Sequence, residues 1–107
     1  MLDYEISPAD AARLLRENTA RLIDVRESWE FATASVEGSV LIPMGEIPSR
    51  GLAELDRSER LVVMCHHGVR SMNVTAWLRR QGFELVQSMR GGIDAWSREV
   101  DPKVTRY

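Results

Sequence analysis

The chain has 107 residues, of which 44% are hydrophobic and 28% are charged, and its formal net charge is −2. This length suits one compact domain, so we expect residues 1–107 to form a single domain with its own core. The balanced charge excludes the basic field that a nucleic acid or an anionic membrane surface requires, and no apolar run is long enough to span a membrane. These properties indicate a cytoplasmic protein with no nucleic-acid or membrane partner.

Short apolar runs alternate with helical signals along the whole sequence. In chain order the predicted elements are a strand at 3–6, a helix from 8, a strand at 21–25, a helix at 27–32, a strand at 40–42, a helix at 48–55, a strand at 61–64, a helix at 71–81, a strand at 85–86 and a helix at 93–99. Strands that alternate with helices are typical of an α/β fold with a mostly parallel sheet.

Four local signals support these elements. Ser7 before Pro8 is typical of a helix N-terminus, and Gly82 is typical of a left-handed helix stop. The run at 61–64, Leu-Val-Val-Met, is apolar on both faces and predicts a central parallel strand. In the helix at 27–32 we expect Trp29 or Phe31 to face the interior, because aromatic side chains bury large apolar areas.

Cys65 is the single cysteine of the chain, and it comes directly after the predicted central strand. One cysteine excludes an internal disulfide, a cysteine-based metal site and a resolving thiol within the chain. One interpretation of a lone cysteine is simply a small buried apolar residue with no chemical role. Its position favours a chemical role instead, because sites in α/β sheets lie where strands end and helices begin.

The turn after Cys65 has the composition of an anion-binding loop, and its residues are Cys65, His66, His67, Gly68, Val69, Arg70 and Ser71. Gly68 allows the turn to curl its N–H groups toward one centre, and the helix that follows adds the positive end of its dipole. The forked guanidinium of Arg70 is suited to bind an oxyanion. The alternative role for Arg70 is that of a helix cap at the surface. We expect loop or rim roles for the two histidines and no metal site, because adjacent histidines rarely bind one ion.

Two charged residues follow the strand at 21–25, and each has two interpretations. Asp24 either ends the strand and pairs locally, or lines or supports the Cys65 loop. Arg26 either takes part in that support or helps to bind an anionic sulfur donor.

Three motifs in this order resemble the rhodanese homology family. They are Leu22-Ile23-Asp24-Val25-Arg26-Glu27 with Trp29-Glu30-Phe31, then Cys65-His66-His67-Gly68-Val69-Arg70-Ser71, then Gly91-Gly92-Ile93-Asp94-Ala95-Trp96. The resemblance implies an α/β fold with a five-stranded, mainly parallel sheet flanked by helices on both faces. It also implies a persulfide on Cys65, formed with neither metal nor organic cofactor. Residues 99–107 resemble rhodanese domains fused to adenylating enzymes of sulfur relays.

The chain departs from the family pattern in one segment. The family often has a Gly-His-Ile-x-Gly-Ala segment after its first motif, and here Ser35 replaces the histidine while Gly38 is kept. We expect that histidine to be structural, so the fold prediction stands.

The function that the resemblance implies is sulfur transfer. The expected donors are thiosulfate or a persulfide, and the expected acceptors are cyanide, a small thiol or an acceptor protein. One alternative is a non-catalytic or partner-loaded sulfur carrier or regulatory module. Another is a phosphatase or arsenate reductase, although related phosphatases have five residues between cysteine and arginine where this chain has four between Cys65 and Arg70. One residue spans about 3.3 Å, so the shorter ring favours a sulfur atom over a phosphate.

Overall fold

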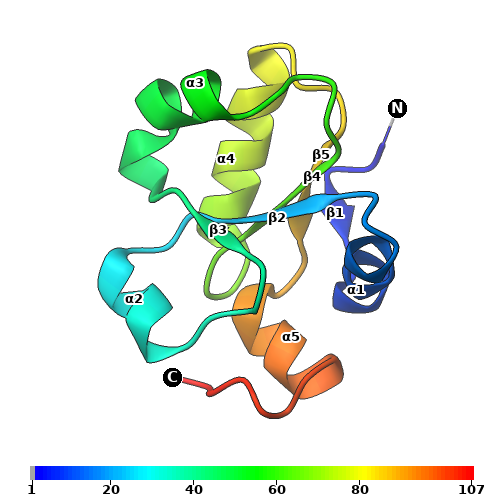
Figure 1. The fold of residues 1–107 in the computed structure, drawn as a ribbon, viewed down its shortest axis with the longest axis vertical. Coiled ribbons are helices and arrows are strands. Elements are labelled where there is room, and N and C mark those ends of the chain that lie inside the picture. The colour runs from blue at the N-terminus through cyan, green and yellow to red at the C-terminus, as the bar shows by residue number, and fades with distance from the viewer. Residues whose placement is uncertain (1) are drawn as a thin grey trace.

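The computed structural model describes residues 2–107, in which strands and helices alternate (Figure 1). The strands are β1 (Glu5–Ile6), β2 (Arg21–Asp24), β3 (Val40–Leu41), β4 (Leu61–Met64) and β5 (Val86–Met89). The helical segments are α1 (Pro8–Arg16), α2 (Ser28–Thr33), η1 (Met44–Glu46), η2 (Ile47–Gly51), α3 (Leu52–Glu54), α4 (Val69–Arg80) and α5 (Gly92–Glu99).

All five strands lie in one sheet in the order β1-β5-β4-β2-β3, and every pairing is parallel. The central position of β4 confirms the prediction from its apolar sequence. Because the strands are parallel, the carboxyl ends of β2, β4 and β5 meet at one edge of the sheet. The segments that follow these strands therefore lie close together, although they are far apart in the sequence.

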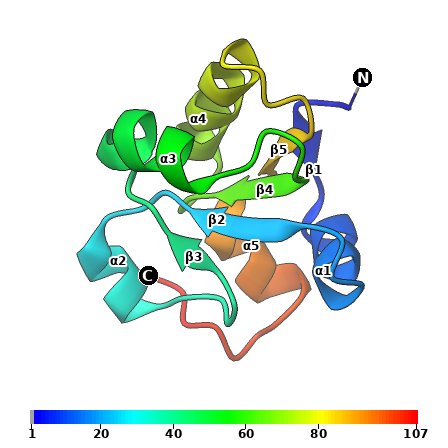
Figure 2. The same cartoon turned by 45° about the horizontal axis from the view of Figure 1, so that its top comes forward.

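Helices cover both faces of the sheet, as expected for a parallel sheet. Figure 2 shows α3 and α4 on one side and α1 and α5 on the other. Strand β4 contributes to both sides, because successive side chains of a strand point to opposite faces. Val62 and Met64 belong to the core cluster with α1 and α5, whereas Leu61 and Val63 belong to the cluster with α4.

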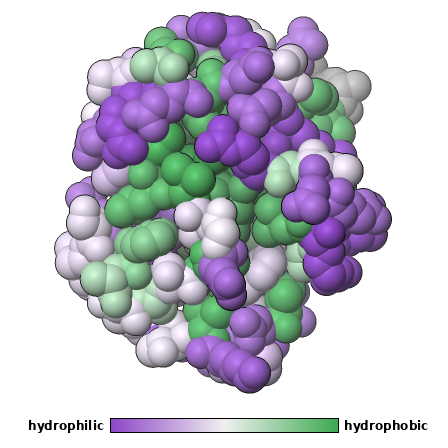
Figure 3. Space-filling view, in the orientation of Figure 1, coloured by the Kyte–Doolittle hydropathy of each residue, from purple (hydrophilic) through white to green (hydrophobic). Residues whose placement is uncertain are grey.

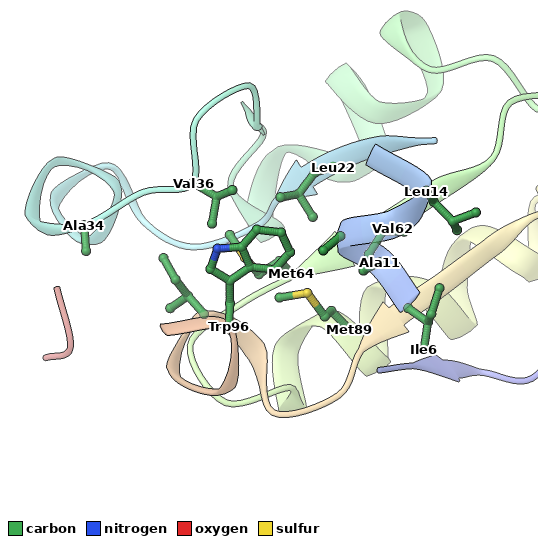
Figure 4. Close-up of a cluster of buried hydrophobic side chains, with 12 residues drawn as sticks. Ile6, Ala11, Leu14, Leu22, Ala34, Val36, Val62, Met64, Met89 and Trp96 are labelled. Carbon is green, nitrogen blue, oxygen red and sulfur yellow. The ribbon is translucent and has the colours of Figure 1, made fainter. Parts of the chain in front are cut away.

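The core cluster on the α1 and α5 face is drawn in Figure 4, where Leu22, Met64, Met89 and Trp96 converge. Helix α1 has the predicted cap, since the N–H of Asp10 donates to Ser7 Oγ over 3.1 Å.

Helix α2 packs differently from the sequence prediction. Neither aromatic residue is buried: Trp29 is 64% exposed and Phe31 is only partly covered. The side chain turned inward is Glu30, which is 3% exposed. The expectation that Trp29 or Phe31 faces the interior was therefore wrong, because Arg70 and Tyr107, from other parts of the chain, hold Glu30 inside.

Most element boundaries differ from the prediction by one or more residues, and two of these differences bear on the site. Helix α4 begins at Val69 rather than residue 71, so Arg70 is helical and Gly68 is the N-cap. Strand β5 continues to Met89, through Gln87 and Ser88, which are polar but buried. Their polarity hides the strand from an apolar pattern.

The surface in Figure 3, in the orientation of Figure 1, has apolar side chains near its middle and hydrophilic ones around them. A shallow groove lies between the η1–η2 segment and α4, and its lining is Met44, Ile47, Pro48, Asn73, Val74 and Trp77. Among residues 2–107, none of the helices has the length and apolar character needed to cross a membrane.

Candidate active site

Cys65 lies at the carboxyl end of the central strand and starts the turn into α4. Its side chain falls in the core cluster that faces α4, as the alternation of β4 requires, and the residue is 1% exposed. The sulfur is therefore held at the bottom of the turn, where the dielectric constant is low and polar contacts count for more than in water.

Two main-chain N–H groups point at the sulfur of Cys65. The N–H of Gly68 donates to Sγ over 3.1 Å, and the N–H of Ser71 donates to it over 3.3 Å. Gly68 makes this possible with a φ of +105°, a left-handed conformation that other residues rarely adopt. Since the turn also lies at the N-terminus of α4, the sulfur sits at the positive end of a helix dipole.

A pair of buried hydroxyl groups extends this set of contacts. The Oγ of Ser71 lies 3.4 Å from Sγ of Cys65 and 2.7 Å from Oγ of Ser88 on β5. Both serines have no exposed surface. Ser71 belongs to the loop motif, whereas no pattern in the sequence pointed to Ser88, which follows the polar Gln87 in β5.

The N-terminus of α5 holds the back of the Cys65 turn. The N–H of Ile93 donates to the carbonyl of Cys65 over 2.8 Å, and that of Asp94 donates to the carbonyl of His66 over 3.2 Å. These contacts turn the two carbonyls toward α5, so the N–H groups of the same trans peptides point the other way. Gly92 permits this approach, because a Cβ there would lie 2.4 Å from both carbonyl oxygens.

Arg70 forms a two-pronged ion pair with Glu30. Its Nη1 and Nη2 atoms donate to Oε1 and Oε2 over 2.6 and 2.9 Å, and the side chains are 31% and 5% exposed. The hydrogen bond to Arg70 is the largest reason why the pKa of Glu30 falls to about 2. Glu30 in turn raises the pKa of Arg70 above its ordinary value. The pair therefore stays fully charged at neutral pH.

Tyr107 links this ion pair to the turn. Its hydroxyl donates to Glu30 Oε2 and accepts from Arg26 Nη1, each over 2.7 Å. Its ring stacks on His66 at 3.9 Å, and its main-chain oxygen lies 2.9 Å from His66 Nε2. Both views place the C-terminal segment beside α2 (Figures 1 and 2). Neither Glu30 nor Tyr107 was expected at the site from the sequence.

The ring of His66 packs against the rings of Tyr107 and His67. Burial, and next the charge of His67, lower its pKa below the ordinary value. Because a carbonyl oxygen only accepts, the Nε2 atom that contacts Tyr107 carries the proton. His67 stacks on the other side of His66 at 3.9 Å and is exposed. His66 is thus partly covered, and His67 lies on the surface beside it.

Asp24 and Arg26 form a buried ion pair next to this network. Both are 0% exposed, and Arg26 Nη2 donates to Asp24 Oδ2 over 2.7 Å. The remaining contacts of the guanidinium are the carbonyls of Glu30 and Ala34 and the hydroxyl of Tyr107. Arg26 has no exposed surface, which speaks against the hypothesis that it binds a donor; its guanidinium instead contacts Tyr107, which packs on His66.

The other predicted site positions lie at the edge. Val69 is 72% exposed at the first turn of α4. Ser35, which replaces the family histidine, is exposed. Within the part of the chain that the structure describes, no three His, Cys, Asp or Glu side chains gather in a way that could hold a metal ion.

Comparison with known proteins places this geometry in a family. The model of the rhodanese-like domain matches residues 7–99. A relative named thiosulfate sulfurtransferase GlpE, from Actinobacillus pleuropneumoniae, is 38% identical over 103 residues, which cover 96% of this chain and 94% of the relative. The putative sulfurtransferase YtwF of Bacillus subtilis is 44% identical over 82 residues, which cover 77% and 78% of the two chains. The chain belongs to the rhodanese-like domain family.

Solved structures agree with this assignment. A rhodanese-related protein from Thermoplasma volcanium superposes with a TM-score of 0.84 at 28% identity, covering 98% of this chain and all of that one. The family and the five-stranded α/β fold predicted from the sequence are thus confirmed. The expected class of activity, a sulfurtransferase, agrees with the names of the full-length relatives.

Proposed function

We propose that this chain is a sulfurtransferase that carries one sulfur atom as a persulfide on Cys65. The observation that supports it most directly is the pair of N–H groups, from Gly68 and Ser71, that converge on Sγ at the end of β4. Fixed donors of this kind stabilise an anion, and a persulfide is an anion in this position. Relatives that carry the name thiosulfate sulfurtransferase over nearly the whole chain support the same activity.

In the first half-reaction the thiolate of Cys65 attacks the outer sulfur of thiosulfate. A bond forms between Sγ and that sulfur, the sulfur–sulfur bond of thiosulfate breaks, and its electron pair leaves with sulfite. A persulfide donor reacts in the same way and releases a thiol. The N–H groups and the hydroxyl of Ser71 stabilise the charge throughout.

In the second half-reaction an acceptor attacks the outer sulfur of the persulfide and restores the thiolate. Cyanide would leave as thiocyanate, and a thiol or an acceptor protein would leave as a persulfide. Since Cys65 is the single cysteine, no internal thiol competes for the sulfur, and the acceptor comes from outside the chain. The acceptors and the cytoplasmic location remain predictions from the sequence.

The test is the release of sulfite on mixing with thiosulfate in the absence of acceptor. A carrier on Cys65 releases one equivalent of sulfite per chain and then stops, and cyanide restarts it. Steady-state kinetics should then be ping-pong. The matched control is Cys65→Ser, which should release none. Sulfite release by the control, or hydrolysis of an aryl phosphate by the unaltered protein, would contradict the proposal.

A further inference from the structure

Glu30 is a charged group close to the candidate site that the proposed mechanism does not use. Its two oxygens take both terminal nitrogens of Arg70, and Oε1 and Oε2 each accept one further hydrogen bond, from the N–H of Glu27 over 3.0 Å and from Tyr107 over 2.7 Å. The carboxylate is nearly buried and fully bonded, so it keeps a fixed place.

Glu30 compensates the positive charge that Arg70 brings to the site. Arg70 is the one arginine of the loop motif, and it interacts electrostatically with Cys65. With a carboxylate 2.6 Å away, the net charge of the pair is zero. The nearby Asp24–Arg26 pair also has a net charge of zero, and burial lowers the pKa of His66, which disfavours a positive charge there. The attraction left for an anionic donor comes mainly from N–H groups and the helix dipole.

Sulfur donors differ in the charge that they bring to such a site. Thiosulfate carries two negative charges, whereas the persulfide of a small neutral thiol carries one or none. A site whose guanidinium is already compensated gains little from the second charge of thiosulfate. A free guanidinium would favour the doubly charged donor.

We propose that Glu30 determines donor specificity: by compensating Arg70 it lowers the preference for doubly charged thiosulfate relative to a neutral or singly charged persulfide. This inference rests on the proposed function. Glu30 acts through Arg70 and is a positioning residue, not a catalytic one.

Neighbouring contacts keep this compensation in place when a donor arrives. Tyr107 holds Glu30 Oε2, and the hydroxyl of Tyr107 is itself held by Arg26, which is buried against Asp24. A carboxylate tied to three elements cannot swing aside to release Arg70. The depressed pKa of Glu30, about 2, also means that its charge persists across the whole neutral range.

The experiment compares the two donors in single turnover. The rate of Cys65 persulfide formation is measured by rapid quench and intact mass, with thiosulfate and with the persulfide of 2-mercaptoethanol. Glu30→Gln keeps the size of the side chain and removes its charge. One unit charge roughly 8 Å from the donor, at an effective dielectric constant of about 30, changes the rate ratio of thiosulfate to persulfide by on the order of 10-fold. We expect this ratio to rise by that factor.

Two further variants separate charge from structure. Tyr107→Phe removes one hydrogen bond from Glu30 but keeps its charge, so the ratio should match that of the unaltered protein. The double variant Glu30→Gln with Arg70→Gln restores zero net charge, so its ratio should return toward the original value. If Glu30→Gln slows both donors equally, Glu30 only shapes the loop and the inference is wrong.

A second measurement decides the matter if Glu30→Gln does not fold. In the unaltered protein, the rate with thiosulfate should fall no more steeply with salt than the rate with the persulfide, since Glu30 compensates the positive charge of Arg70. A steep fall for thiosulfate alone would overturn the inference. If neither donor places sulfur on Cys65, the proposed function itself fails, which is a different outcome from an unchanged ratio.

Discussion

Gly92→Ala places a methyl group against the backbone that carries Cys65. The new Cβ would lie 2.4 Å from the carbonyl oxygens of both Cys65 and His66, a separation that real Cβ atoms essentially never show. Gly92 also has a φ of +61°, in the left-handed region that favours glycine. The variant therefore combines backbone strain with a direct overlap, and the overlap falls on the peptides that orient the turn.

The magnitude follows from these two contributions. A left-handed conformation at a non-glycine residue costs about 1 kcal/mol. Relieving an overlap with two backbone oxygens requires a backbone shift, which costs about 1–3 kcal/mol in a packed region. We expect a loss of about 3 kcal/mol in the free energy of unfolding, equivalent to a decrease of roughly 15 °C in Tm for a domain of this size.

Gly38→Ala is the matched control. Gly38 has a φ of +86°, but a Cβ there meets nothing within 4 Å. This variant should lose only about 1 kcal/mol, from conformation alone. Urea unfolding measures both losses, and rapid quench with thiosulfate measures sulfur loading. Loading should slow by at least about 10-fold in Gly92→Ala, as for loss of a preorganised donor, and stay unchanged in Gly38→Ala. Equal losses of stability in the two variants, or full loading by Gly92→Ala, would refute the reasoning.

Three further predictions concern charged and polar groups. Because the folded-state pKa of Glu30 is depressed from 4.5 to about 2, its contribution to stability is present above the unfolded value and is lost as the pH falls toward 2. Urea unfolding across this pH range should show a loss of about 3 kcal/mol in the free energy of unfolding, and Glu30→Gln should lack this loss. An equal loss in Glu30→Gln would show that Glu30 is not its source. Asp24→Asn leaves the Arg26 charge buried and unpaired, so thermal unfolding should show about 3–5 kcal/mol of destabilisation; a loss below about 1 kcal/mol would mean that the pair is dispensable. Ser71→Ala removes a hydroxyl worth about 1 kcal/mol to the thiolate, so stopped-flow measurement of sulfite release should slow about 5-fold, and an unchanged rate would show that the hydroxyl does not act on the sulfur.

Local sequence patterns predicted the parts of the fold that depend on near neighbours. The apolar run of β4, the cap at Ser7 and the stop at Gly82 each involve a few adjacent residues, and the structure has all three. The position of Cys65 at the end of the central strand followed from the same reasoning. Conformational freedom at Gly68 was likewise expected, and the turn uses it to adopt a left-handed conformation.

The parts that escaped prediction depend on contacts between distant residues. Glu30 is turned inward by Arg70, 40 residues away, and by Tyr107, 77 residues away, so no pattern within α2 reveals it. A helical pattern instead favours the burial of Trp29. Ser88 is a similar case, since a serine in a buried strand is explained only by its bond to Ser71.

The persulfide itself gives the most direct test of the account. The intact mass of the protein should rise by one sulfur atom after incubation with thiosulfate, and cyanide should return it to the original value. Cys65→Ser should show no change under either condition. A protein that stays at its original mass with both thiosulfate and a small persulfide, while Cys65 remains reduced and the chain folded, would contradict the claim that this turn holds a transferable sulfur.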